Sequence, residues 1–145
     1  MDLELKGKTA VVTGTSIGIG RAIAKMLAQE GVRVVGVARR KELLDTLVQE
    51  SGGAIIPLVL DLVADGAADQ LAKTAIAELG HVDILVNNAG GSRPLPIDAP
   101  DSAWDESIAL NFTSYRKITH ALLPQMIARN WVASSTSRAN PSRRG

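Results

Sequence analysis

The segment TGTSIGIG, residues 13–20, places three glycines where an apolar run at residues 9–14 gives way to an expected helix. In such a unit the first turn of the helix presents unpaired backbone N–H groups and a positive dipole end above the strand. Gly14 permits the sharp turn, Gly18 lets a pyrophosphate approach the backbone, and Gly20 lets the helix pack closely on the strand. The spacing predicts a dinucleotide site, and a tight turn without a ligand is the alternative.

Polar residues also follow the next three expected strands, at the edge where doubly wound sheets bind ligands. Arg39 and Arg40 follow the second strand, where a carboxylate would indicate NAD, whereas arginines suit a 2′-phosphate and indicate NADP. A solvated basic loop is the alternative there. Asp61 follows the third strand and could accept a hydrogen bond from an adenine amino group. The residues Asn-Asn-Ala-Gly at 87–90 follow the fourth strand and leave room for a flat ligand against the backbone.

The elements that must position these residues are apolar strand-like runs alternating with amphipathic helix-like runs. Each strand is nearly continuously apolar, which indicates a parallel sheet covered by helices on both faces. The sequence therefore predicts an α/β, Rossmann-type, doubly wound domain over residues 1–130. Pro57 predicts an edge position for its strand, because proline donates no ladder hydrogen bond. The four expected strands lie at residues 9–14, 32–38, 54–62 and 82–90.

After a proline-rich loop, residues 101–130 have the pattern of one long helix or of two abutting helices. Asp101 or Ser102 could cap its start, since short polar side chains accept hydrogen bonds from first-turn amides. Pro124 should kink it, because proline removes one helical hydrogen bond and crowds the preceding turn.

Composition and charge exclude several functional classes. The chain has no cysteine and only two histidines, so we expect no disulfide framework and no metal site. It shows no leader-like segment and no run long enough to span a membrane, so a cytoplasmic location is expected. Thirteen of the sixteen Lys and Arg and all fifteen acids lie in residues 1–130, which leaves that part at −2 and the tail at +3. Three unorganised arginines make a weak case for nucleic acid, so no nucleic-acid partner is expected.

In combination, these motifs resemble the short-chain dehydrogenase/reductase family, particularly its 3-oxoacyl-reductase-like members. The resemblance runs from about Leu5 to Arg129 and includes TGxxxGIG, the Asp-Leu pair after the third strand, NNAG, and ALNFTS on the long helix. It implies a nicotinamide-dependent oxidoreductase of a carbonyl/alcohol pair, with Asn111 as the catalytic-tetrad asparagine that orders a water in a proton relay. The cofactor-binding residues that it implies, together with those argued above, are Gly14, Ser16, Ile17, Gly18, Ile19, Gly20, Arg39, Asp61, Leu62, Asn88, Ala89 and Gly90.

The sequence departs from the family pattern in its catalytic residues. The family also uses a serine after the long helix and a Tyr-x-x-x-Lys motif, and neither is present. The only tyrosine is Tyr115, with Thr119 four residues on. With about four of the family's usual seven strands, the chain is expected to be the cofactor-binding half of a parent reductase, itself a homo-oligomer acting on a small carbonyl or alcohol. We expect it to be inactive. A non-catalytic nucleotide-binding or regulatory fragment is the alternative, and a basic-tailed interaction protein ranks below both.

Residues 131–145, WVASSTSRANPSRRG, fit neither pattern and are expected to form an irregular basic tail. We interpret this tail as the product of a reading-frame shift. If each original codon is the last base of one present codon plus the first two of the next, Trp131–Val132 gives GGT and forces Gly. With TCx serine codons and a CGx codon for Arg138, the same frame then permits Arg-Φ-Φ-Asn-Φ-Ser, where Φ is apolar. That is the fifth strand expected of the family at this place. A natural Ser/Arg-rich terminus is the alternative. Without a fifth strand, the strand at residues 82–90 would be an exposed apolar edge that invites aggregation.

Overall fold

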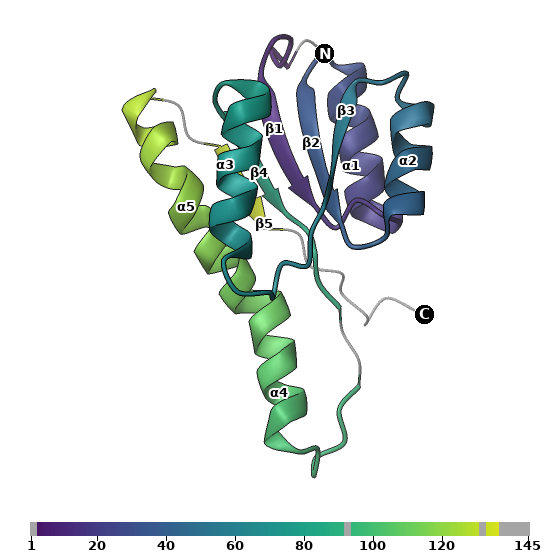
Figure 1. Cartoon of the computed structure of the whole chain (residues 1–145), viewed down its shortest axis with the longest axis vertical. Helices are drawn as coiled ribbons and strands as arrows, with labels where there is room; N and C mark the ends of the chain where they lie inside the picture. The colour runs from purple at the N-terminus through teal and green to yellow at the C-terminus, as the bar shows by residue number, and fades with distance from the viewer. Residues whose placement is uncertain (1–2, 92–93, 131–132, 137–145) are drawn as a thin grey trace.

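The computed structural model describes residues 3–91, 94–130 and 133–136, and it contains one parallel sheet in the order β3-β2-β1-β4-β5 (Figure 1). The predicted Rossmann-type α/β class is confirmed. The elements, in chain order, are β1 (Thr9–Thr13), α1 (Gly18–Gln29), β2 (Arg33–Ala38), α2 (Lys41–Glu50), β3 (Ile55–Val59), α3 (Ala67–Leu79), β4 (Ile84–Asn87), α4 (Asp101–Ile108), a π-helix (Ala109–Thr113), α5 (Ser114–Ala128) and β5 (Ala133–Thr136).

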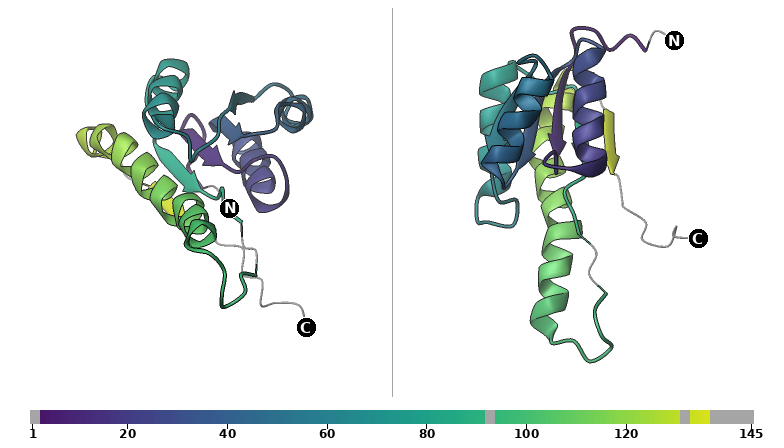
Figure 2. Two further views of the ribbon diagram at one scale, coloured as in Figure 1. Left: turned by 60° about the horizontal axis from the view of Figure 1, so that its bottom comes forward. Right: turned by 90° about the vertical axis from the view of Figure 1, so that its right-hand side faces the viewer.

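Two hydrophobic clusters lie on opposite faces of the sheet, because successive strand residues point to opposite sides. Ala10 and Val12 of β1 pack with α1 and α2, whereas Val11 packs with α3 and α5. All three side chains are completely buried. Figure 2 shows α1 on one side of the strands and α3 and α5 on the other. The strands are therefore continuously apolar because both of their faces are buried, as predicted.

The two edges of the sheet give one confirmation and one correction. β3, which contains Pro57, pairs only with β2 and is an edge strand as predicted. At the other edge, β5 pairs in parallel with β4, and Ile84 lies opposite Ala133. The expectations of an irregular tail and of an unpaired fourth strand are therefore wrong for residues 133–136. A strand needs mainly backbone hydrogen bonds, so a small polar segment can form one beside an apolar neighbour.

The long helix is continuous but changes its hydrogen-bonding pattern. α4 passes into the five-residue π-helix and then into α5. Neither Asp101 nor Ser102 caps its start: Pro100 occupies the N-cap position, and no side chain bonds the first-turn amides. That prediction is wrong, because the helix begins one residue earlier than a side-chain cap would require. Pro124 lies inside α5, and the kink predicted there stays a prediction. No residue of α4 is buried, and the helix extends beyond the sheet (Figure 1).

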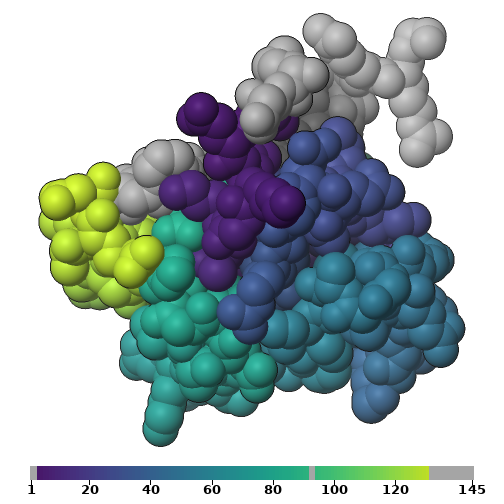
Figure 3. Space-filling model, turned by 90° about the horizontal axis from the view of Figure 1, so that it is seen from above, coloured from purple at the N-terminus to yellow at the C-terminus, as the bar shows by residue number. Residues whose placement is uncertain are grey.

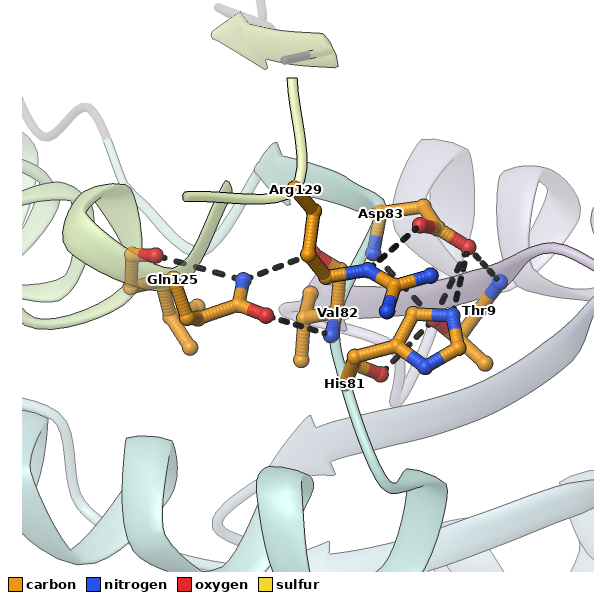
Figure 4. A network of polar contacts seen from close by, with 7 residues as sticks. Thr9, His81, Val82, Asp83, Gln125 and Arg129 are labelled. Carbon is orange, nitrogen blue, oxygen red and sulfur yellow. Dashed lines mark hydrogen bonds and ion pairs between the residues drawn. The ribbon is translucent and has the colours of Figure 1, made fainter. Parts of the chain in front are cut away.

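A buried carboxylate joins the beginnings of β1 and β4. Figure 3 shows the molecule from above, with the purple N-terminal segment facing the viewer. Asp83, only 3% exposed, accepts a hydrogen bond from the backbone amide of Thr9 at 3.0 Å (Figure 4). Its Oδ2 lies 3.2 Å from Nε2 of His81, and its Oδ1 lies 3.9 Å from Nε of Arg129. These contacts hold two strands together whose residues are 74 positions apart in the chain.

A second contact ties α5 to the same end of the sheet. The side-chain oxygen of Gln125 accepts a hydrogen bond from the backbone amide of Val82 at 3.1 Å, and its nitrogen donates to the Val82 carbonyl at 2.7 Å. Both polar groups of one backbone residue are thus satisfied by a single side chain. Within the described residues, no helix is long and apolar enough to cross a lipid bilayer.

Candidate functional site

The turn after β1 is built from glycines that the surrounding backbone requires. Gly14 has a φ of +72°, which L side chains rarely adopt, and an added Cβ would lie 2.7 Å from the Ala89 Cα. Gly20 has an ordinary helical φ, but a Cβ there would overlap the side-chain nitrogen of Asn88 and the carbonyl oxygen of Gly14. Both glycines therefore allow the turn and the first helix to lie against the residues that follow β4.

Thr13, which the sequence analysis did not single out, holds the turn and the NNAG segment together. Its completely buried hydroxyl accepts hydrogen bonds from the backbone amides of Asn88 and Ala89, both at 3.0 Å. Asn88 in turn donates from its side chain to the Gly14 carbonyl at 3.2 Å. The structure thus brings together two predicted segments that are about 75 residues apart. A threonine at the end of a buried strand was the available signal, but strand propensity alone accounts for threonine there.

The hydrogen bonds that join Thr13 and Gly14 to Asn88 and Ala89 form a contact that we call the clasp. Gly18 and its neighbours lie next to the clasp in the same turn and face open space. Gly18 has a φ of +65°, and a Cβ built on it would meet nothing within 4 Å. Ile17 is the N-cap residue of α1 and makes no side-chain cap, and no side-chain hydrogen bond to the first-turn amides is found among the described residues. Ile17 and Ile19 are more than half exposed, at 61% and 52%, and Ser16 is half-buried. Unsatisfied amides beside open space can receive an anion.

The residues predicted to contact the adenosine part of the cofactor follow β2 and β3. They lie at the carboxyl ends of the strands, as Gly14 does. Arg39 and Arg40 are exposed, and neither forms an ion pair in the described part of the chain. Asp61 is also exposed, and its Oδ1 accepts a hydrogen bond from the backbone amide of Val63 at 3.2 Å. Leu62, which lies between Asp61 and Val63 in the sequence, is half-buried. One oxygen of Asp61 therefore shapes its own turn, and the other has no hydrogen bond to a described residue.

Asn111 lies in the π-helix and grips the loop that follows β4. Its side-chain nitrogen donates to the Gly91 carbonyl at 2.9 Å, while its oxygen accepts from the Gly91 amide at 3.2 Å. The same nitrogen also donates to the Ser107 carbonyl at 2.9 Å. A Cβ on Gly90 would lie 2.8 Å from the Asn111 oxygen and 3.1 Å from the Tyr115 hydroxyl. Segments of π-helix are frequent at functional sites, and here the segment aims Asn111 at the NNAG loop.

Asn87 is a buried polar residue whose hydrogen bonds are incomplete. It is 1% exposed, and its side-chain nitrogen donates to the Thr119 hydroxyl at 3.2 Å. Its side-chain oxygen has no hydrogen-bond partner among the described residues. Buried oxygens are nearly always partnered, so this one indicates a missing donor. The described residues include no group of three or more acidic or histidine side chains that could hold a metal ion.

Comparison with known proteins agrees with this geometry. A family model described as short chain dehydrogenase matches residues 8–134. A short chain dehydrogenase of Pseudocercospora fijiensis is 45% identical over 132 residues, which cover 87% of this chain and 43% of that protein. The 3-oxoacyl-[acyl-carrier-protein] reductase of Thermotoga maritima is 33% identical over 129 residues, covering 86% and 52%. The chain thus spans about half the length of the curated relatives it matches.

A solved structure shows the same arrangement of elements. A 7α-hydroxysteroid dehydrogenase complexed with NADH and 7-oxo glycochenodeoxycholic acid matches with a TM-score of 0.88 at 33% identity. The match covers 93% of this chain and 54% of the other.

Proposed function

Because the chain belongs to the short-chain dehydrogenase family, we propose that it is the cofactor-binding half of a reductase acting on a carbonyl/alcohol pair. The observation that carries this proposal is the clasp between the turn at Gly14 and the segment Asn88–Ala89. The strand order reverses between β1 and β4, and doubly wound sheets bind dinucleotides at such a switch point. The clasp lies at that reversal.

In this proposal the residues of the chain bind and orient the cofactor, and the nicotinamide supplies hydride when it is bound. The free amides before α1 receive the pyrophosphate, and Gly18 leaves the space for its approach. Asp61 and Leu62 meet the adenine, while Asn88, Ala89 and Gly90 form the floor beneath the cofactor. Asn111 keeps that floor in position through Gly91.

We propose NADPH as the preferred cofactor, because Arg39 and Arg40 form no ion pair with any described residue at the end of β2. The solved relative is complexed with NADH, so this preference is a property proposed for this chain alone. Calorimetry should show tighter binding of NADPH than of NADH. Arg39→Asp should reverse that order by about tenfold or more, since a charge-assisted hydrogen bond contributes about 1.5–3 kcal/mol. Lys73→Asp, an exposed change on α3, is the matched control. Equal affinities, or no effect of Arg39→Asp, would contradict the assignment.

We further propose that the sequence after Trp131 is read in a shifted frame. Position 136 lies opposite Asn87 in the β4–β5 register, and the side-chain oxygen of Asn87 has no hydrogen-bond partner among the described residues. Restoring one base gives a codon ending in AC at position 136, which encodes Tyr, His, Asn or Asp, and three of these carry a donor. If Ser134 and Ser135 have TCx codons, the same change makes positions 134 and 135 apolar, beside Leu85 and Val86. Both features suit a strand on this edge of the sheet.

Restoring the base and extending into the downstream DNA tests this proposal. The open frame should encode a Tyr-x-x-x-Lys, and the repaired protein should oxidise NADPH with a ketone, whereas the present chain should not. A general acid contributes on the order of 10²–10⁴-fold, and correct placement of two reactants contributes still more. Asn111→Ala should then slow turnover while cofactor binding remains. A downstream frame without that motif, or a repaired protein that binds NADPH and never turns over, would remove the basis of the frameshift proposal.

We propose that the parent protein is a homo-oligomer associating through α4. Trp104 and Ile108 of α4 recur at four-residue spacing with Phe112 of the adjoining π-helix, and we call these three residues the apolar stripe of α4. Each is about half exposed, at 48%, 53% and 60%. A continuous apolar stripe on a helix that buries no residue is typical of an interaction surface.

A further inference from the structure

The β3–α3 loop approaches the long helix (Figure 1). A groove lies there, beside the proposed cofactor site, and Leu62 is the one residue that the two share. One wall is the loop after β3 with the first turn of α3, and the other is the π-helix with the first half of α5. Its volume is about 320 Å³, enough for a small organic molecule.

Basic side chains dominate the α5 wall of this groove. Arg116, Lys117 and His120 all line it, and Asp69 of α3 is the one acid in the lining. The side chains of Arg116 and Lys117 form no ion pair or hydrogen bond with any described residue, and the same holds for the His120 side chain. Two adjacent permanent cations therefore face a single carboxylate, and the groove has an excess of positive charge.

Three other cationic side chains of the described residues, Arg21, Lys25 and Lys41, do pair with anions. Glu50 is shared by Lys25 at 3.0 Å and Arg21 at 2.9 Å, and these contacts, Lys25 first, lower the pKa of the Glu50 carboxyl. Lys41 pairs with Asp45 at 2.6 Å. Among the described residues, adjacent cations without an ion pair occur in the groove and at the Arg39–Arg40 pair. A concave surface that carries one sign of charge concentrates counter-ions of the other sign.

The opposite wall supplies apolar surface. Leu62 and Val63 line it together with alanines of the loop and of α3, and Val63 is 48% exposed. A ligand that satisfies both walls carries an oxyanion group and a short apolar chain. We propose that the groove binds a small amphipathic anion of this kind, with the oxyanion held by Arg116 and Lys117 and the chain lying over Leu62 and Val63.

The test uses the full 145-residue chain without cofactor and measures octanoate binding by calorimetry. Octylammonium, which has the same chain and the opposite charge, should not bind. The double substitution Arg116→Gln/Lys117→Gln should weaken octanoate by about tenfold, since two charge contacts of about 0.5–1 kcal/mol each are lost. Lys73→Gln, an exposed change outside the groove lining, should have no effect.

A second variant acts in the opposite direction. Asp69→Asn removes the competing carboxylate and should raise the affinity for octanoate by about two- to fivefold. Misfolding would lower this affinity, so it cannot account for an increase. Arg39→Asp should leave octanoate unchanged, which separates this groove from the proposed cofactor site. Equal binding of octanoate and octylammonium would show adsorption to the apolar stripe of α4. That result, or octanoate binding unchanged by both groove variants, would overturn the proposal.

Discussion

Gly20→Ala is the substitution that tests the geometry of the site most directly. The added methyl group would overlap the Asn88 side-chain nitrogen and the Gly14 carbonyl oxygen, which are themselves hydrogen-bonded at 3.2 Å. The helix can relieve this overlap only by moving away from the turn, or Asn88 can relieve it by rotating and giving up its bond. Either response separates α1 from the segment that follows β4.

The expected cost follows from these two responses. Overpacking a well-packed position costs about 1–3 kcal/mol, and the lost hydrogen bond adds about 0.5–1.5 kcal/mol. Alanine offsets part of this, because it is better than glycine in a helix by about 0.8–1.0 kcal/mol. We therefore expect the free energy of unfolding to fall by about 2–3 kcal/mol. For a chain of this length that is a fall in Tm of roughly 6–12 °C.

Gly18→Ala is the matched control, two residues away. Its Cβ would meet nothing within 4 Å, so only the left-handed φ of +65° opposes it, at about 1–2 kcal/mol. Urea denaturation should thus rank Gly20→Ala as the more damaging change to the fold. NADPH calorimetry should show that Gly18→Ala nevertheless abolishes binding, because its methyl group occupies the space proposed for the pyrophosphate. If Gly20→Ala costs less than 1 kcal/mol, the close approach of α1 to Asn88 is not a feature of the folded protein.

The buried carboxylate and the apolar stripe of α4 give the remaining predictions. Asp83→Leu should lower the free energy of unfolding by about 3–5 kcal/mol in urea denaturation, because it breaks a buried charged network and leaves the Thr9 amide without an acceptor. A loss below 1 kcal/mol would mean that the network adds little. Ile108→Glu in the frame-restored protein should shift sedimentation toward the monomer, since it places a charge in the middle of the stripe. An unchanged oligomer would place the interface elsewhere.

The sheet and its edge strand could be predicted because they depend on local pattern. Continuous apolar runs between amphipathic ones specify a parallel sheet with two covered faces, and Pro57 excludes its strand from the middle. Gly14 and Gly20 could likewise be assigned to a tight turn, because few residue types tolerate such close backbone contacts.

The features that sequence reasoning missed depend on partners far away in the chain. The role of Thr13 requires the amides of Asn88 and Ala89, and the role of Asp83 requires Thr9, so neither residue is distinctive by itself. β5 was missed for a different reason: its residues lack strand-like apolar character, and only the register with β4 reveals it. The Asp101 or Ser102 cap failed because cap preference does not fix the first residue of a helix.

Because no residue of α4 is buried, this helix gains little stability from packing of its own. Eight residues, none of them buried, are too few to stay helical alone in water, so the order of α4 depends on α5 through the π-helix. In hydrogen exchange, the opening free energy of the α4 amides should be near zero, while that of the α5 amides should approach the free energy of global unfolding. Asn111 lies between these two regimes. A ligand that holds Gly91 more firmly against Asn111 therefore also extends the ordered length of the helix. Ordering α4 lowers its conformational entropy, so the binding free energy is reduced by a cost that arises in a segment the ligand does not contact.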